Sequence, residues 1–228
     1  MHSRVHTTAP VPRRLLLPLC WALAYTALFF GFTLIQGARR AGFDAWHQAV
    51  SALSLGPAGW LQSVNLVLFG LVLAATSLAW RPILRGGPGA VAYPVLTALA
   101  GFGFVLTGII PQDPAPGYDP ANLGLTAPTL PGLLHLAAAA VAALCSVAGL
   151  LVMARRFRRD GNWAGWPAYT WITAVATVLC VAAYGVGSTE PSGFAGTFER
   201  AAILLPAVWA AVFVRRLWRG TPFMRVFS

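Results

Sequence analysis

Four side chains able to do chemistry recur at helical spacing in one segment of the chain, FDAWHQAVSALSLGPAGW. Asp44, His47, Ser51 and Ser54 are three, four and three residues apart, so a helix would place them on one face. One interpretation is a short helix that presents His47 and two hydroxyls to a pocket, where the imidazole could act as a general base. The other is an amphipathic interfacial helix whose polar face only meets water.

A second pair, Asp113 and His135, flanks a proline-rich segment. Residues 111–132 read PQDPAPGYDPANLGLTAPTLPG and hold six of the seventeen prolines, which predicts a stiff, non-helical loop. A structured loop of this length is often a lid or a binding loop, and Tyr118 within it is a candidate substrate-binding residue. Asp113 and Asp119 lack the ligand spacing of an EF-hand. Alternatively, Asp113 caps a turn and His135 hydrogen-bonds to a neighbouring helix.

Glu199 and Arg200 form the third candidate group, at the start of the last apolar stretch. A carboxylate in the first turn of a helix is favoured by the helix dipole, and this alone would explain Glu199. Arg200 needs a partner at the edge of the hydrocarbon. That partner is either a carboxylate, from Asp113 or Glu199, or a bound anion such as a lipid head group.

The composition determines what kind of protein must position these groups. The chain has 228 residues, of which 57% are hydrophobic and 10% charged, with a mean hydropathy of +0.68, whereas soluble domains carry about 25% charged residues. This excludes a soluble enzyme and a disordered chain. Three cysteines cannot form a disulfide framework. A helical membrane protein remains.

Six windows are long and apolar enough to span a bilayer, which takes about 20 residues. We therefore predict an all-α, polytopic membrane protein, one domain over 1–228 with six transmembrane helices in one bundle. The first window exceeds the 7–15 residues of a signal peptide core, so we expect it to be retained. The expected spans are residues 15–37, 60–80, 91–110, 133–154, 168–187 and 198–217.

The arginines predict the orientation. There is no lysine, and 13 of the 16 arginines fall in the two tails, the second loop and the fourth loop. Short cytoplasmic loops accumulate arginine, so both termini are expected to be cytoplasmic, and nucleic-acid binding is not expected. The helix near His47 and the proline-rich loop then lie outside, together with five of the six acidic residues. The arginine- and alanine-rich composition is typical of actinobacteria, so we expect a bacterial cytoplasmic (inner) membrane.

Three segments carry a resemblance to a known family. HQAVSALSLGPAGWLQSVNLVLFG, GIIPQDPAPGYDP and PGLLH closely resemble the six-span bacterial and archaeal family called domain of unknown function 998, from about Leu15 to Leu217. The resemblance implies six spans and matches Ser51, Ser54, Gly56, Asp113 and His135 to recurrent motif positions. It implies no activity.

Two functions are open. We favour an integral membrane protein whose outer-face polar pocket binds a lipid or other hydrophobic small molecule, or docks a membrane-protein partner; no cofactor is expected. The alternative is a membrane enzyme acting on a lipid or isoprenoid by acid/base or metal-assisted chemistry. A transporter is less favoured, because no broken helices or internal repeat are evident. The candidate catalytic residues are His47, Asp113, His135 and Glu199, and the candidate substrate-binding residues are Ser51, Ser54, Arg200 and Tyr118.

The pocket hypothesis makes a geometric prediction. His47, Asp113, His135 and Glu199 should converge within about one side-chain length. No metal is expected, but if one is present, His47, His135 and Asp113 would be its ligands, because a catalytic zinc needs three protein ligands.

Overall fold

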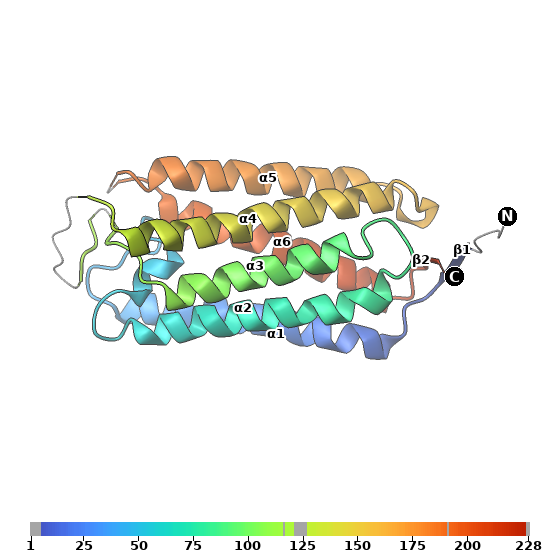
Figure 1. Ribbon diagram of the computed structural model, residues 1–228, viewed down its shortest axis with the longest axis horizontal. Coiled ribbons are helices and arrows are strands. Elements are labelled where there is room, and N and C mark those ends of the chain that lie inside the picture. The colour runs from blue at the N-terminus through green and yellow to red at the C-terminus, as the bar shows by residue number, and fades with distance from the viewer. Residues whose placement is uncertain (1–5, 116, 121–126, 191, 227–228) are drawn as a thin grey trace.

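Six long helices make up most of the chain in the computed structural model, which describes residues 6–115, 117–120, 127–190 and 192–226 (Figure 1). Each helix is long and apolar enough to cross a membrane, which confirms the predicted all-α, six-span fold. The helices begin and end within about three residues of the expected spans. The agreement is expected, because the thickness of the hydrocarbon layer determines the length of each apolar stretch and of the helix that it forms. They are α1 (Arg13–Arg39), α2 (Trp60–Ile83), α3 (Ala92–Ile109), α4 (Leu130–Phe157), α5 (Trp166–Gly187) and α6 (Ala195–Trp218).

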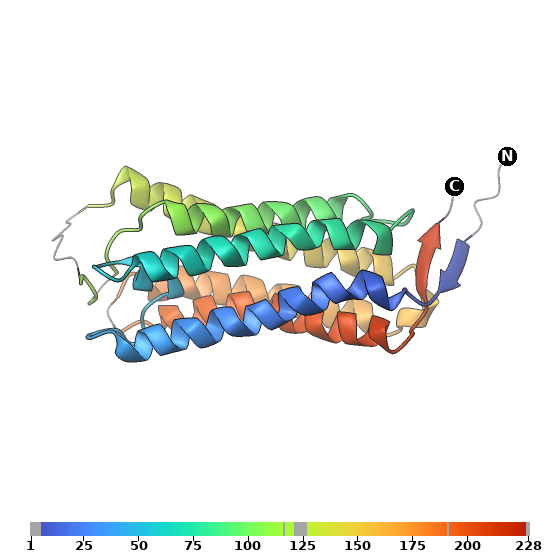
Figure 2. The same ribbon diagram turned by 90° about the horizontal axis from the view of Figure 1, so that it is seen from below.

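The helices form a closed up-and-down bundle. Each packs against the next in sequence, and α6 returns to pack against α1. In Figure 2, α1 crosses obliquely in front of the bundle between α2 and α6. A short 3-10 helix, η1 (Val50–Ser54), contacts α1, α2, α3 and α6. A second, η2 (Gly161–Trp163), lies between α4 and α5.

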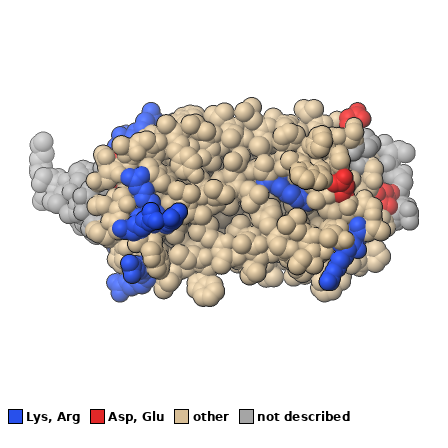
Figure 3. Space-filling model, turned by 180° about the vertical axis from the view of Figure 1, so that it is seen from behind, with Lys and Arg blue, Asp and Glu red and all other residues tan. Residues whose placement is uncertain are grey.

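The two ends of the bundle differ. We call the end with both termini the tail end; it also holds the α2–α3 and α4–α5 connections and an antiparallel ribbon of β1 (His6–Ala9) and β2 (Phe223–Val226) (Figure 1). The opposite end, with the other three connections, is the loop end. On the face in Figure 3, most basic side chains gather at the tail end, whereas the acidic ones lie toward the loop end together with a few basic ones. This is the segregation from which we expect a cytoplasmic tail end.

Close helix packing depends on glycine where α2 meets α3. A Cβ added to Gly70 would lie 2.4 Å from the carbonyl oxygen of Gly101, and a Cβ on Gly101 would lie 2.5 Å from that of Gly70. The two backbones therefore touch directly, as small residues allow between membrane helices.

The tail end contains a cluster of buried aromatic rings and a buried arginine. Trp163, Trp209 and Phe213 are at most 1% exposed. Arg156 is also 1% exposed, and its Nη1 donates to carbonyl oxygens of the α2–α3 connection, at 3.0 Å to Leu84 and 2.9 Å to Pro88. Arg156 therefore holds α4 to the α2–α3 connection. It has this structural role in addition to being one of the arginines that predict the orientation of the chain.

The segment with His47 differs from the expected amphipathic helix. Ala49 is extended (φ −61°, ψ 156°) and separates the turns at 44–48 from η1. Val50, Ala52 and Leu53 are at most 1% exposed, so η1 is inserted between the helices instead of lying on a water surface. The expectation of one helix with a common polar face was wrong, because the segment is buried on several sides and its polar groups bond within the protein.

Candidate functional site

His47 and Asp44 form a hydrogen-bonded pair at the loop end. Asp44 Oδ2 lies 2.7 Å from His47 Nδ1, and Asp44 Oδ1 accepts from the backbone N–H of Trp46 at 2.8 Å. The N–H of Trp46, and after it the His47 ring, hold the pKa of Asp44 below its usual value. The His47 ring stacks on Phe194, with centroids 5.1 Å apart. The carboxylate thus orients the imidazole as in acid/base sites, although no hydroxyl or thiol in the described residues hydrogen-bonds to that ring.

Arg200 holds the segment before η1 by its carbonyl groups. Its Nη1 donates to Ala45 O at 2.7 Å, Gln48 O at 2.9 Å and Gly196 O at 2.8 Å. Arg200 lies within 4 Å of no carboxylate in the described part of the chain, so the ion pair considered from the sequence is replaced by carbonyl contacts. Its buried Nε and Nη2 have no hydrogen-bond partner there. These two atoms share the guanidinium edge that binds a two-oxygen acceptor.

Glu199 holds the same segment by a backbone N–H. Because α6 begins at Ala195, Glu199 lies in the second turn, and the expected first-turn position was wrong. The interaction with the helix dipole fades beyond the first turn, so another contact must account for this carboxylate. Its Oε2 accepts from the N–H of Val50, the first residue of η1. Glu199 and Arg200 together attach the 45–50 segment to α6.

Asp113 and His135 join α3 to α4. Asp113 Oδ2 accepts from Thr129 N at 2.9 Å, and Oδ1 accepts from Thr129 Oγ1 at 2.6 Å, at the first turn of α4. A Cβ on Gly132 would lie 2.1 Å from Asp113 Oδ2, so only glycine leaves room for this carboxylate. His135 Nδ1 lies 2.8 Å from the carbonyl oxygen of Ile110, at the end of α3. Both side chains are occupied at the helix junction.

The four expected catalytic residues therefore lie in two separate sets of contacts. His47 and Glu199 contact the 44–50 segment and the start of α6, whereas Asp113 and His135 contact the α3–α4 junction. The described residues contain no group of three or more His, Cys, Asp or Glu side chains able to hold a metal ion. The conditional zinc ligands His47, His135 and Asp113 are thus not brought together as one site.

The remaining candidates contact other parts of the loops. Ser51 is 6% exposed, and its carbonyl oxygen accepts from Ser54 Oγ at 2.7 Å. Tyr118 packs edge-on against Phe43, with centroids 5.5 Å apart. Burial raises the pKa of Tyr118, and the Arg40 guanidinium opposes this effect. Arg40, which the sequence did not single out, donates to the carbonyl oxygen of Leu55 at 2.6 Å.

A polar network between α1 and α2 was missed from the sequence. Gln36 Nε2 donates to Gln62 Oε1 at 2.8 Å, and Asn65 Nδ2 lies 3.3 Å from Gln62 Oε1 and from Thr33 Oγ1. Gln62 is fully buried and Asn65 is 6% exposed. The signal in the sequence is a set of uncharged polar residues inside apolar windows, which a criterion based on charge alone does not detect.

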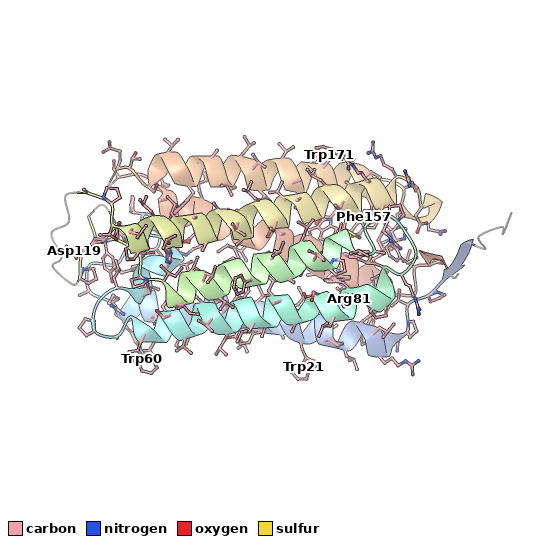
Figure 4. All side chains as sticks on the ribbon, viewed as in Figure 1. Trp21, Trp60, Arg81, Asp119, Phe157 and Trp171 are labelled. Carbon is pink, nitrogen blue, oxygen red and sulfur yellow. The ribbon has the colours of Figure 1, made fainter. Side chains whose placement is uncertain are left out.

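A groove of about 510 Å³ opens beside this network, on the outer surface of α1 and α2. Asn65 is one of its polar lining residues. Trp60, also in the lining, is 63% exposed and projects away from the bundle (Figure 4). The lining is otherwise largely aliphatic and aromatic: Tyr25, Ala27, Leu28, Phe29, Gly31, Phe32 and Ile35 from α1, with Leu61, Val64 and Leu68 from α2.

Comparisons with known proteins identify the family. The model of a family described as "Protein of unknown function (DUF998)" matches residues 23–216. Searches of curated proteins and of solved structures gave no match. The matched range contains both groups of loop-end contacts, the α1–α2 groove and nearly all of the six helices. The chain is a multi-pass membrane protein and belongs to the DUF998 family.

Proposed function

We propose that this protein binds a hydrophobic small molecule from the lipid phase in the groove between α1 and α2. The observation that carries the proposal is the groove itself, an apolar groove of about 510 Å³ whose lining includes Asn65 of the buried polar network. Small-molecule sites are typically apolar, with a few polar groups that fix orientation. An apolar chain along the lining and a polar head near Asn65 match this pattern.

The hydrogen bonding of the network indicates the kind of head group. Asn65 is the network residue that lines the groove; its Nδ2 donates to Thr33 Oγ1 and Gln62 Oε1, whereas its Oδ1 accepts no hydrogen bond from the described residues. A buried acceptor without a donor costs free energy, and a ligand hydroxyl or N–H would remove that cost. The favoured ligand is therefore a long-chain or isoprenoid molecule with a hydrogen-bond-donating head, in the leaflet at the loop end. From the arginine count, that leaflet is taken to be the outer one of a bacterial cytoplasmic membrane.

A pair of matched substitutions tests this proposal. A Cβ on Gly31, in the groove lining, meets nothing within 4 Å, and the same holds for Gly185 on α5, away from the groove. Gly31→Phe should fill the groove, whereas Gly185→Phe adds the same ring to another lipid-facing position. Oleyl alcohol in mixed micelles is the probe, because a ligand that binds only the folded state raises Tm.

The expected result is a rise in Tm with oleyl alcohol for the wild type and for Gly185→Phe, and none for Gly31→Phe. Solvent extraction of each purified protein followed by mass spectrometry should show a co-purified hydroxylated lipid that is depleted only in Gly31→Phe. Equal behaviour of the two variants would remove the groove as the binding site.

A membrane enzyme is the second candidate, and the Asp44–His47 pair favours it. An imidazole oriented by a carboxylate can remove a proton from a bound substrate or from water. In that case His47→Gln should abolish turnover of a lipid ester or amide while leaving binding in the α1–α2 groove unchanged. Turnover that survives His47→Gln would exclude this pair as the acid/base group.

A further inference from the structure

The opposite end of the bundle carries a second groove, between α1 and α6. It has a volume of about 420 Å³. Cys20 and Leu23 of α1 and Ala211 and Val214 of α6 form its apolar wall. The packing of α1 against α6 is less extensive than that of α1 against α2, which leaves this gap at the tail end. The groove is separate from the α1–α2 groove and shares no lining residue with it.

The mouth of this groove is basic. Arg215 and Arg219 line it, one helical turn apart and both exposed. Neither lies within 4 Å of a carboxylate in the part of the chain that the structure describes. A third cation comes from α1, where the Arg13 guanidinium lies over the ring of Trp218, 5.4 Å from its centroid. Trp218 also lines the groove, so two guanidinium groups line the groove and a third lies against one of its lining residues.

The neighbouring Arg216 has a different set of contacts. Arg216, on the other side of α6, donates to the carbonyl oxygen of Asn162 at 2.7 Å and lies 4.4 Å from the ring centroid of Trp163. It is thus occupied within the protein. Arg215 and Arg219 instead present their side chains outward at the level where α6 ends.

We propose that the α1–α6 groove binds one anionic phospholipid at the tail end of the bundle. The guanidinium groups match a phosphate in charge and in fork geometry. The apolar wall accepts an acyl chain running along α1 and α6. Basic pockets between helices on the cytoplasmic side, where anionic lipids are abundant, are suited to such head groups. A free phosphate ion would use the arginines but would leave the apolar wall without a partner.

The test compares charge variants with an equal change in net charge. Arg215→Gln/Arg219→Gln removes two cations from the groove, and Arg158→Gln/Arg159→Gln removes two exposed cations from the same end outside it. Native mass spectrometry of the full chain, released from nanodiscs of mixed phosphatidylglycerol and phosphatidylcholine, counts the retained lipids. The affinity of the Arg215→Gln/Arg219→Gln variant for phosphatidylglycerol should fall by about 25-fold, because each arginine near an anionic surface contributes about fivefold to the affinity. The control pair should retain it.

A second pair of variants tests the apolar wall without changing charge. Ala211→Phe fills the groove, and Val212→Phe places the same ring at an exposed position of α6 outside the lining. Only Ala211→Phe should release the lipid. This pair decides the matter if the arginine variants prove too unstable to purify.

Three results would overturn the proposal. One is an equal loss for the two arginine pairs, which would indicate only general surface charge. Another is equal retention of phosphatidylcholine and phosphatidylglycerol by the wild type. The third is displacement of the lipid by excess inorganic phosphate, which would indicate a site for the free ion. None of these results depends on ligand binding in the α1–α2 groove.

Discussion

Replacing Arg200 by alanine should destabilise the fold strongly, although no acidic partner is lost. The guanidinium holds three carbonyl oxygens through one nitrogen, those of Ala45, Gln48 and Gly196. Hydrogen bonds to a charged donor are worth about 1.5–3 kcal/mol each, whereas bonds between membrane helices average about 0.6 kcal/mol. Nη1 has two hydrogens, so two of the three carbonyl oxygens share one of them; counting each contact between the membrane average and the lower value for a charged donor gives a loss of about 2–5 kcal/mol in the free energy of unfolding.

The assay is reversible unfolding in mixed micelles by added SDS, followed by circular dichroism. Arg155→Ala is the control, because Arg155 is exposed near the end of α4 and its removal costs the same formal charge. Arg200→Lys separates charge from shape: an ammonium keeps the charge but not the planar fork of donors. We expect the lysine variant to recover about half of the loss, because its ammonium offers three donor hydrogens but ends one bond short of the position of Nη1.

The outcome that refutes this reasoning is a loss for Arg200→Ala within about 0.5 kcal/mol of the loss for Arg155→Ala, the range usual for surface substitutions. The 45–50 segment would then be held by Glu199 and by η1 packing alone. Full recovery by Arg200→Lys would show instead that charge alone, and not the guanidinium geometry, holds the three carbonyl groups.

Three further predictions concern the same assay. Because the folded-state pKa of Asp44 is lowered, its stabilising contribution should be complete above about pH 4, the unfolded value, and should be lost as the pH falls through the folded value; Asp44→Asn should remove that slope, and an unchanged slope would contradict it. Gly101→Val should cost about 1–3 kcal/mol through overpacking, because a Cβ meets Gly70 O at 2.5 Å, whereas Gly185→Val, with open space at Cβ, should cost less; equal costs would mean that α2 and α3 can separate freely. Asp113→Ala should cost about 0.5–2 kcal/mol, the usual value of a helix cap, and no change would show that the α3–α4 junction does not need this carboxylate.

The sequence predicts the helices well because one physical quantity determines them. A span requires an apolar stretch of fixed length, and the ends of α1 to α6 follow from where arginine, proline and glycine interrupt such stretches. The segregation of charge between the two ends could also be predicted, because the positions of the apolar stretches determine at which end each loop lies. Counting alone, however, treats all arginines alike. Arg156 is 1% exposed and bonded to two carbonyl groups, whereas Arg155 beside it is exposed.

The loop-end contacts were harder to predict, because spacing along a segment does not reveal what surrounds it. The 3-4-3 spacing of Asp44, His47, Ser51 and Ser54 predicts a helix only if nothing else competes for the backbone. Glu199, some 150 residues away, takes the N–H of Val50 and helps to hold η1 inside the bundle. The α1–α2 groove could not be predicted from the sequence either, because it depends on how the two helices pack against each other.

The motif residues that carry the family resemblance have structural tasks at the loop end. Gly56 has a φ of +75°, and a Cβ on Gly59 would lie 1.9 Å from the carbonyl oxygen of Ser54. The SALSLGPAG motif thus specifies the backbone turn that leads from η1 into α2.

Asp113 and His135 likewise close the α3–α4 junction, with both side chains hydrogen-bonded there. The residues at these motif positions make the contacts that hold the loop end together. If the groove proposal is correct, ligand selection then falls to groove residues such as Gly31 and Leu28 of α1, which lie outside the three motif segments. Substitution at these positions should change which lipid co-purifies without lowering stability. Substitution in the motifs should lower stability first, because their side chains and turns hold the helices in register.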